Sequence, residues 1–283
     1  MTFDFAEFIL DSAERYQKEK KMTNFTVKVL DSENSILFEK TETEELAAVY
    51  DGEYKKGDKI QLSADRNAIF TIVKLDDTMD YSYTFLNGIF TMEIPFDEKK
   101  MAHNPKSFTG KRHYFYAREA RAEEIKARKN LALNVWDCHE NTALFPHTSA
   151  NVETRGESVF ASRNAIDGLL ANTFHGEWPY SSWGINKNPE AELTLDFGRK
   201  VKADEVVIYL RADFPHDAWW TQGSITFSDG STLTMNFEKH GKAQRFTFPE
   251  KEITSLKLHS LIKADDPSPF PALTQIEVYG TEA

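Results

Sequence analysis

Apolar and polar residues alternate along much of this chain, which is the pattern of half-buried β-strands. The alternation is clearest in "NFTVKVL" (24–30) and "RHYFYARE" (112–119). In "YSYTFLNGIFTMEIPF" (81–96), Asn87-Gly88 stands between two alternating runs and predicts a β-hairpin, because a type I′ turn needs positive φ at both central positions. Further strands of this first half are predicted at 35–40, 58–64 and 68–75.

The alternation restarts in the second half of the chain. Asp229-Gly230 predicts another tight hairpin there. Short strands at regular spacing, with little helix between them, indicate an antiparallel sandwich or jelly roll. These strands are predicted at 191–198, 203–214, 224–237, 243–249, 255–261 and 274–280.

Two stretches have helical character instead. The apolar residues from Phe5 to Tyr16 fall at helical spacing, and residues 117–133 are rich in helix formers. We therefore expect an all-β protein made of two β-sandwich (jelly-roll) domains, with an N-terminal helix and a short helical linker. The expected divisions are an N-terminal helix at 1–20, a β-sandwich of unassigned role at 21–130 and a second sandwich at 131–283.

Composition narrows the classes of partner. The 283 residues suit two domains, and no apolar run approaches the roughly 18 residues of a membrane span. A net charge of −11 repels polyanions, so a nucleic-acid partner is not expected. The sequence shows no secretory signal, and the single cysteine, Cys138, excludes an intramolecular disulfide, so we expect a cytoplasmic protein.

The candidate chemistry is concentrated in the second half. Four of the five tryptophans fall in segments that do not alternate like strands. Three segments combine aromatic residues with Asp, Glu, His or Arg and are interrupted by proline. They are "HGEWPYSSWGIN" (175–186), "RADFPHDAWW" (211–220) and "IKADDPSPFPALTQ" (262–275).

This combination suits a sugar, because an aromatic face stacks on the apolar side of a pyranose while polar groups bind its hydroxyls. The alternative for each tryptophan is a place in the core. Trp219 and Trp220 cannot both point inward on one strand, since neighbouring residues face opposite sides. The candidate ligand-binding residues are His175, Glu177, Trp178, Trp183, Arg211, Asp213, His216, Asp217, Trp219, Trp220, Asp265 and Asp266.

"NAIDGLLANTFHGEW" (164–178), "LDFG" (195–198) and the terminal "TQIEVYG" (274–280) resemble the discoidin family, also called coagulation factor five/eight type C domains. Within it, the similarity is to bacterial family 32 carbohydrate-binding modules, and it covers residues 135–283. The resemblance implies a galactose-binding-like jelly roll for the second domain. The whole chain also resembles a bacterial group of uncharacterised two-domain proteins described as carbohydrate-binding.

The same resemblance implies a structural calcium ion. In the family, a turn aspartate, a threonine and a glutamate of the last strand enclose it, and oxygen donors are what this hard cation requires. The matching residues here are Asp167, Thr173 and Glu277, with Asn172 as a further candidate. The spacing around Thr173 departs from the family pattern, and Asp167 could instead cap a turn.

Three functions remain open at this stage. The leading hypothesis is a non-catalytic carbohydrate-binding protein. The His, Glu and Asp residues of the three segments would also suffice for a carbohydrate-active or metal-dependent hydrolase. An exposed aromatic patch would also serve a protein-interaction module.

Overall fold

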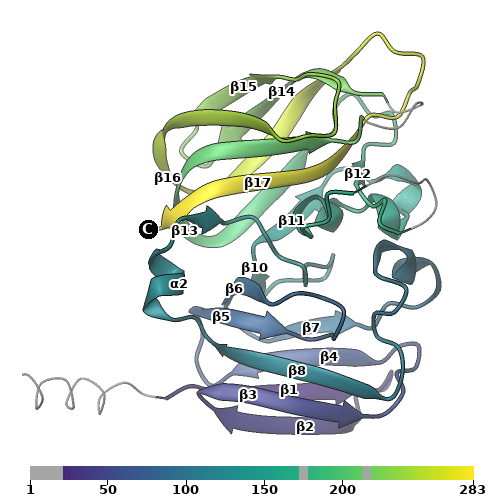
Figure 1. Ribbon diagram of the computed structural model, residues 1–283, viewed down its shortest axis with the longest axis vertical. Coiled ribbons are helices and arrows are strands. Elements are labelled where there is room, and N and C mark those ends of the chain that lie inside the picture. Colours follow the sequence, from purple (N-terminus) through teal and green to yellow (C-terminus); the bar gives the residue numbers. More distant parts are fainter. Residues whose placement is uncertain (1–21, 172–177, 213–217) are drawn as a thin grey trace, which may run out of the picture.

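The protein folds into two β-rich domains that are stacked along its long axis (Figure 1). The structure is a computed structural model and describes residues 22–171, 178–212 and 218–283. The predicted all-β fold class is confirmed, because these residues are organised mainly as antiparallel strands. The helix predicted for residues 1–20 lies outside them. No helix in the described ranges is long and apolar enough to cross a membrane.

The first domain is a sandwich of two antiparallel sheets around an apolar core. Alternate residues point into that core, as in β1 (Asn24–Leu30), which buries Phe25, Val27 and Val29. This strand and β8 (Arg112–Glu119) begin and end at the predicted residues. One sheet has the order β2 (Ile36–Thr43), β1, β4 (Lys59–Ala64), β7 (Phe90–Glu93), and the other the order β10 (Leu144–Phe145), β6 (Ser82–Leu86), β5 (Ile69–Lys74), β8, β3 (Glu45–Asp51).

The hairpin predicted at Asn87-Gly88 is wrong, although the chain does bend there. Gly88 has a φ of 123°, which glycine adopts readily. Before the bend, β6 pairs with β5 and β10, whereas β7 after it pairs with β4 in the other sheet. The Asn87 N–H donates to the Ala143 carbonyl at 2.8 Å. The chain therefore crosses from one sheet to the other at this point.

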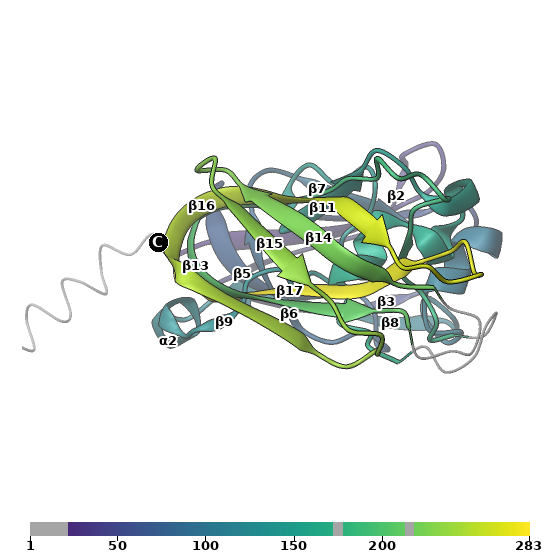
Figure 2. The ribbon, with the colours of Figure 1, turned by 90° about the horizontal axis from the view of Figure 1, so that it is seen from above.

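The strands of the second domain form a hydrogen-bonded sheet that curves around a core of its own (Figures 1 and 2). Its longest strands, β13 (Leu193–Leu210) and β16 (Gln244–Lys263), each unite two segments that were predicted separately. Their pairing shifts between Asp196 and Val201, so the strands continue through an irregularity. The strand order is β12 (Trp183–Gly184), β17 (Ala272–Glu282), β13, β16, β14 (Trp220–Phe227), β15 (Thr232–Asn236), with β11 (His147–Ala150) beside β13 and β9 (Lys129–Asn130) beside β17.

Glycine is required at two places in this sheet. The hairpin at Asp229-Gly230 is confirmed, because β14 pairs with β15 on either side and Gly230 has a φ of 82°. Gly280 lies on β17, where an added Cβ would stand 1.9 Å from the carbonyl oxygen of Lys202 on β13. The glycine that ends the "TQIEVYG" motif thus permits a close approach of two backbones.

The segment that follows the predicted boundary between residues 130 and 131 contributes to both cores. The helical part of the linker is α2 (Ala122–Lys126), which is shorter than the predicted stretch 117–133. Leu131 packs in the second core. Trp136 packs fully buried in the first core and donates its Nε1–H to the Val73 carbonyl at 3.2 Å. The two sandwiches are therefore joined by a packed segment.

Direct contacts between the domains strengthen this connection. In the first domain, η1 (Asp97–Ala102) packs against η3 (Ser158–Phe160) of the second. Arg199 forms a buried ion pair with Glu282 at 2.8 Å, and its guanidinium carbon lies 5.6 Å from the ring centroid of Phe70 in the first domain. These contacts fix the second domain on the first.

Candidate functional site

The structure brings the described parts of the three aromatic segments together at one end of the second domain. The Arg211 N–H donates to the Ala272 carbonyl at 3.0 Å, and Ala218 forms a bridge with Pro271. Trp183 pairs with Leu273 across β12 and β17. The described parts of segments 175–186, 211–220 and 262–275, far apart in the sequence, are therefore neighbours in space.

A pocket of about 290 Å³ lies where these segments meet. Its size is close to the lower end of the range for small-molecule sites, about 300 Å³. Aromatic rings and polar groups share its wall. Its lining residues include Thr154, Phe160, Asn186, Arg211, Ser268 and Phe270.

Arg211 is the predicted site residue that lines this pocket. Its side chain is almost fully buried, at 3% exposure. Its Nη1 donates to Ser182 Oγ at 3.3 Å, and its guanidinium carbon lies 5.7 Å from the ring centroid of Tyr180 and 5.9 Å from that of Phe160. Cationic guanidinium over aromatic rings is a favourable packing. Arg211 is thus a fixed cationic donor group at the pocket wall.

Phe270 forms an accessible aromatic surface on the same pocket. Its side chain is 46% exposed, and the Lys187 Nζ lies 4.7 Å from its ring centroid. An exposed phenylalanine ring costs hydration free energy that a ligand could recover by stacking on it. Phe270 is therefore the described aromatic residue best placed to receive an apolar ligand face.

The backbone beside Phe160 is shaped by close packing. Gly184 has no side chain, and an added Cβ would stand 2.6 Å from Thr154 Oγ1. Thr154 Oγ1 accepts a hydrogen bond from the Asn186 N–H at 2.9 Å. Asn186 has a φ of 48°, a left-handed conformation that asparagine tolerates better than most residues. This turn places Asn186 in the pocket wall.

Trp183 and Trp220 require a correction, because both belong to the core of the second domain. Trp183 is fully buried and donates its Nε1–H to the Val152 carbonyl at 3.0 Å. Trp220 is 1% exposed, and the two ring centroids are 6.5 Å apart. A ring without an exposed face cannot stack on a sugar, so neither is a ligand-binding residue.

The other described candidates have different surroundings. Trp219 is partly exposed and packs against the edge of the core, with its carbonyl accepting the Ala264 N–H at 3.0 Å. Asp265 is exposed, and Asp266 pairs with Lys239 at 2.8 Å. Trp178 lines a separate pocket. Five candidates lie outside the described residues: His175, Glu177, Asp213, His216 and Asp217.

The calcium assignment stays a prediction. Asp167 is buried in the turn before Gly168, and burial raises its carboxyl pKa to about 7 although Arg163 opposes this shift. Burial also raises the pKa of Glu277, which Arg245 and a hydrogen bond from Tyr279 oppose. The two carboxyl groups thus have different neighbours, and the described ranges contain no cluster of three His, Cys, Asp or Glu side chains that could hold a metal. Thr173 and Asn172 lie outside those ranges.

Of the lining residues, sequence reasoning selected Arg211 and missed the others, among them Phe270, Asn186 and Phe160. Phe270 stood inside the quoted segment "IKADDPSPFPALTQ", flanked by Pro269 and Pro271, and that setting in a polar loop was a usable signal of exposure. Asn186 ended the segment 175–186 and was not selected. Phe160 carried no local signal, because only the folded chain places it beside Arg211.

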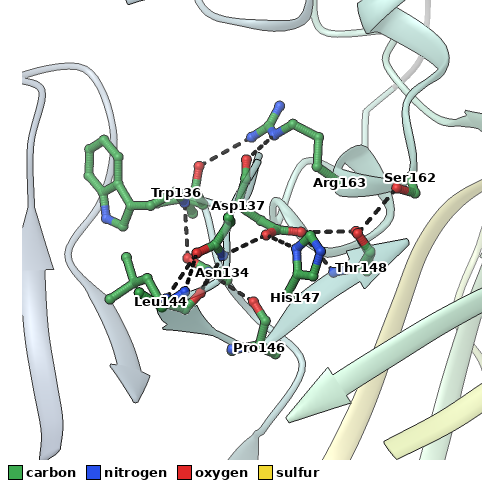
Figure 3. Close-up of polar contacts among 12 residues, drawn as sticks. Asn134, Trp136, Asp137, Leu144, Pro146, His147, Thr148, Ser162 and Arg163 are labelled. Atoms are coloured by element: carbon green, nitrogen blue, oxygen red, sulfur yellow. Dashed lines mark hydrogen bonds and ion pairs between the residues drawn. The ribbon is translucent and has the colours of Figure 1, made fainter. Parts of the chain in front are cut away.

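A buried cluster of polar side chains surrounds Asp137 (Figure 3). The Asp137 side chain accepts four hydrogen bonds, from His147 Nδ1 at 2.7 Å, Asn141 Nδ2 at 2.9 Å, and the N–H and Oγ1 of Thr148 at 2.9 Å each. Arg163 Nε donates to the Asp137 carbonyl at 2.7 Å. A carboxylate offers about four acceptor positions, so the fold itself uses all of them. The pair of Asp137 and His147 is therefore an anchor of the fold.

We expect this anchor to make stability depend on pH through His147. Burial lowers the pKa of His147, but the hydrogen bond that His147 donates to Asp137 and the charges of Asp137 and Asp196 outweigh burial and raise it above 6.5. The stabilisation is then fully present below the unfolded pKa and is lost as pH rises through the higher folded pKa. His147→Asn should therefore lower the free energy of unfolding more at about pH 5.5 than at about pH 8.5. Urea unfolding at both pH values tests this, and an equal loss at both would contradict it.

Comparison with known proteins gives the following matches. A family model described as a domain of unknown function (DUF7402) matches residues 141–265, and no curated protein matches the chain. A chitosan-binding module of a Paenibacillus sp. IK-5 chitosanase/glucanase is 18% identical over 54% of this chain and 99% of its own, with a TM-score of 0.38. A Streptococcus pneumoniae fucose-binding module is 15% identical; the match covers 54% of this chain and 99% of the module, with a TM-score of 0.40. A C. perfringens family 32 module in complex with galactose is 18% identical; the match covers 47% of this chain and 91% of the module, with a TM-score of 0.36.

Proposed function

We propose that the second domain binds a carbohydrate in the pocket between Phe160, Arg211 and Phe270. The observation that carries this proposal is the exposed Phe270 ring beside fixed polar groups, at the end of the domain where the described parts of the three aromatic segments converge. A pocket with an aromatic surface and a few placed hydrogen-bonding groups is the usual design of a small-molecule site. The fold alone would not support a function.

The chemistry of the pocket suits a pyranose ring. The apolar C–H face of the sugar would stack on Phe270. The Arg211 guanidinium and the Asn186 side chain would bind ring hydroxyls, and a hydrogen bond to a charged group is stronger than one between neutral groups. Similar solved structures are named for chitosan, fucose and galactose, so modules of this kind take different sugars.

A glycan array on the full chain tests the proposal, with the variant Phe270→Ala beside the wild type. We expect Phe270→Ala to weaken binding at least about tenfold, because an aromatic contact residue commonly contributes this much to affinity. The matched control is Ile89→Ala, which removes a 59% exposed apolar side chain from the first domain. It should bind like the wild type.

Thermal unfolding of both variants separates loss of binding from loss of fold. Phe270 is exposed, so its replacement should leave the melting temperature close to that of the wild type. A folded Phe270→Ala protein that binds the same glycans with unchanged affinity would contradict the proposed site.

A further inference from the structure

The pocket beside Phe270 is cationic, although the protein as a whole is acidic. The chain has 45 acidic and 34 basic residues and a net charge of −11. The described residues of the pocket wall include Arg155 and Arg211 but neither aspartate nor glutamate. Lys187 adds a third cation, because its Nζ lies 4.7 Å from the ring centroid of Phe270. Positive charge is therefore concentrated at this pocket, against the net charge of the chain.

Two of these cations lie against one aromatic ring. The guanidinium carbon of Arg155 is 5.5 Å from the ring centroid of Phe160, and that of Arg211 is 5.9 Å from it. Arg211 is almost fully buried, whereas the Arg155 side chain is 57% exposed. Like charges at one ring repel each other, and an anion bound next to them is attracted by both.

The turn of Asn186 and Lys187 places the third cation at the pocket. These two residues have φ values of 48° and 63°. Lysine adopts this left-handed conformation at a cost in free energy, whereas glycine adopts it readily. In the part of the chain that the structure describes, no carboxylate forms an ion pair with Lys187. Its ammonium group is therefore available to a ligand.

Two carboxylates that contact residues of the wall are already paired. Glu157 accepts hydrogen bonds from Arg155, from Nε at 2.5 Å and from Nη2 at 2.7 Å. Asp266 accepts the Ser268 N–H at 2.9 Å and pairs with Lys239 at 2.8 Å. The wall thus keeps a positive charge that these carboxylates do not offset.

We propose that this pocket selects acidic glycans, in which a sugar carries a carboxylate or sulfate group. The inference rests on the proposed function and specifies the class of sugar. The sugar ring stacks on Phe270, and its anionic group pairs with the Lys187 ammonium in the positive potential of Arg155 and Arg211. A cationic wall attracts such a ligand and repels an amino sugar.

A glycan array with neutral, uronic-acid, sialylated and sulfated members tests the class of ligand on the full chain. We expect the bound glycans to carry an acidic group. Each of them is then compared with its neutral counterpart by calorimetric titration. The acidic form should bind at least about tenfold more tightly at about 0.05 M salt, and the difference should shrink at about 0.5 M, because salt screens exposed charges.

A matched pair of variants tests the role of Lys187. Lys187→Glu and Lys111→Glu change the net charge equally, and the Lys111 side chain is 72% exposed on the first domain. Lys187→Glu should weaken binding of an acidic glycan about tenfold, because an attraction becomes a repulsion, whereas Lys111→Glu should weaken it less than about twofold. Lys187 is exposed, so its replacement should leave the melting temperature close to that of the wild type.

Four results would overturn the inference. An array that binds only neutral glycans, or equal affinity for an acidic glycan and its neutral counterpart, would do so and leave the proposed function intact. An array that binds no glycan would remove both. Equal effects of Lys187→Glu and Lys111→Glu would show that Lys187 does not select the ligand. Acidic glycans that bind Phe270→Ala as tightly as the wild type would lie outside this pocket.

Discussion

Asp137→Ala is expected to lower the free energy of unfolding by about 3–5 kcal/mol, the usual cost of removing one partner from a buried charged pair. The Asp137 side chain has no exposed surface. Its loss leaves His147, Asn141 and Thr148 with buried donors that have no acceptor, and each such group costs about 1–3 kcal/mol. Urea unfolding at constant pH measures the change.

Two variants control for charge and shape. Asp265→Ala removes an exposed carboxyl group and should change the free energy of unfolding by less than about 0.5 kcal/mol. Asp137→Asn keeps the shape but turns an amide donor toward Thr148 or toward His147, so it should also destabilise the protein. If Asp137→Ala were as stable as Asp265→Ala, the cluster would not be an anchor.

The position of this cluster explains why the effect should reach both domains. Trp136, next to Asp137, packs in the first core, and Arg163 belongs to the second domain. Asn134 Nδ2 donates to the carbonyls of Leu144 and Pro146, which holds the connecting loop closed (Figure 3). Loosening this loop therefore loosens the contact between the sandwiches.

Local patterns in the sequence were enough to predict single strands but not their partners. β1 and β8 match the predictions residue for residue, because burial on one face imposes a period of two. Asn87-Gly88 carries the chemistry of a tight turn, yet the strands on either side belong to different sheets. Sheet membership depends on contacts between distant parts of the chain, which a turn dipeptide does not encode.

Strand ends in the second domain were misjudged for a related reason. Two predicted strands ended at Gly198 and Pro249, but both residues lie within the long strands β13 and β16. Neighbouring strands supply hydrogen bonds on each side of the irregularity and keep the chain extended. Tertiary pairing here overrides local propensity.

The sequence predicted one region of the second domain, and the structure brings the described parts of its three aromatic segments together, with Arg211 in the wall of the pocket between them. The ligand-binding role of this region stays a prediction. The candidate list, which followed tryptophan content, nevertheless included Trp183 and Trp220, which are buried in the core, and omitted Phe270, which is exposed. Composition identifies a segment rich in aromatic residues, whereas the direction of each ring depends on the bend of the loop that carries it.

Trp219 and Trp220 are adjacent, but their replacement is expected to change the free energy of unfolding by very different amounts. Trp220→Ala should lower the free energy of unfolding by about 3–5 kcal/mol, because it removes a fully buried aromatic side chain and leaves a cavity. Trp219 is partly exposed at the edge of the same core, so Trp219→Ala should cost about 1 kcal/mol. Denaturant unfolding of the two variants under the same conditions measures the difference.

A third variant separates the volume of Trp220 from its polar atom. Trp220 Nε1 has no hydrogen-bond partner among the described residues, so Trp220→Phe loses ring volume but no hydrogen bond, and it should cost less than Trp220→Ala. Equal losses for Trp219→Ala and Trp220→Ala would contradict the assignment of Trp220 to the core. Because Trp219→Ala should remain folded, any loss of glycan binding in that variant would extend the ligand surface from Phe270 to Trp219.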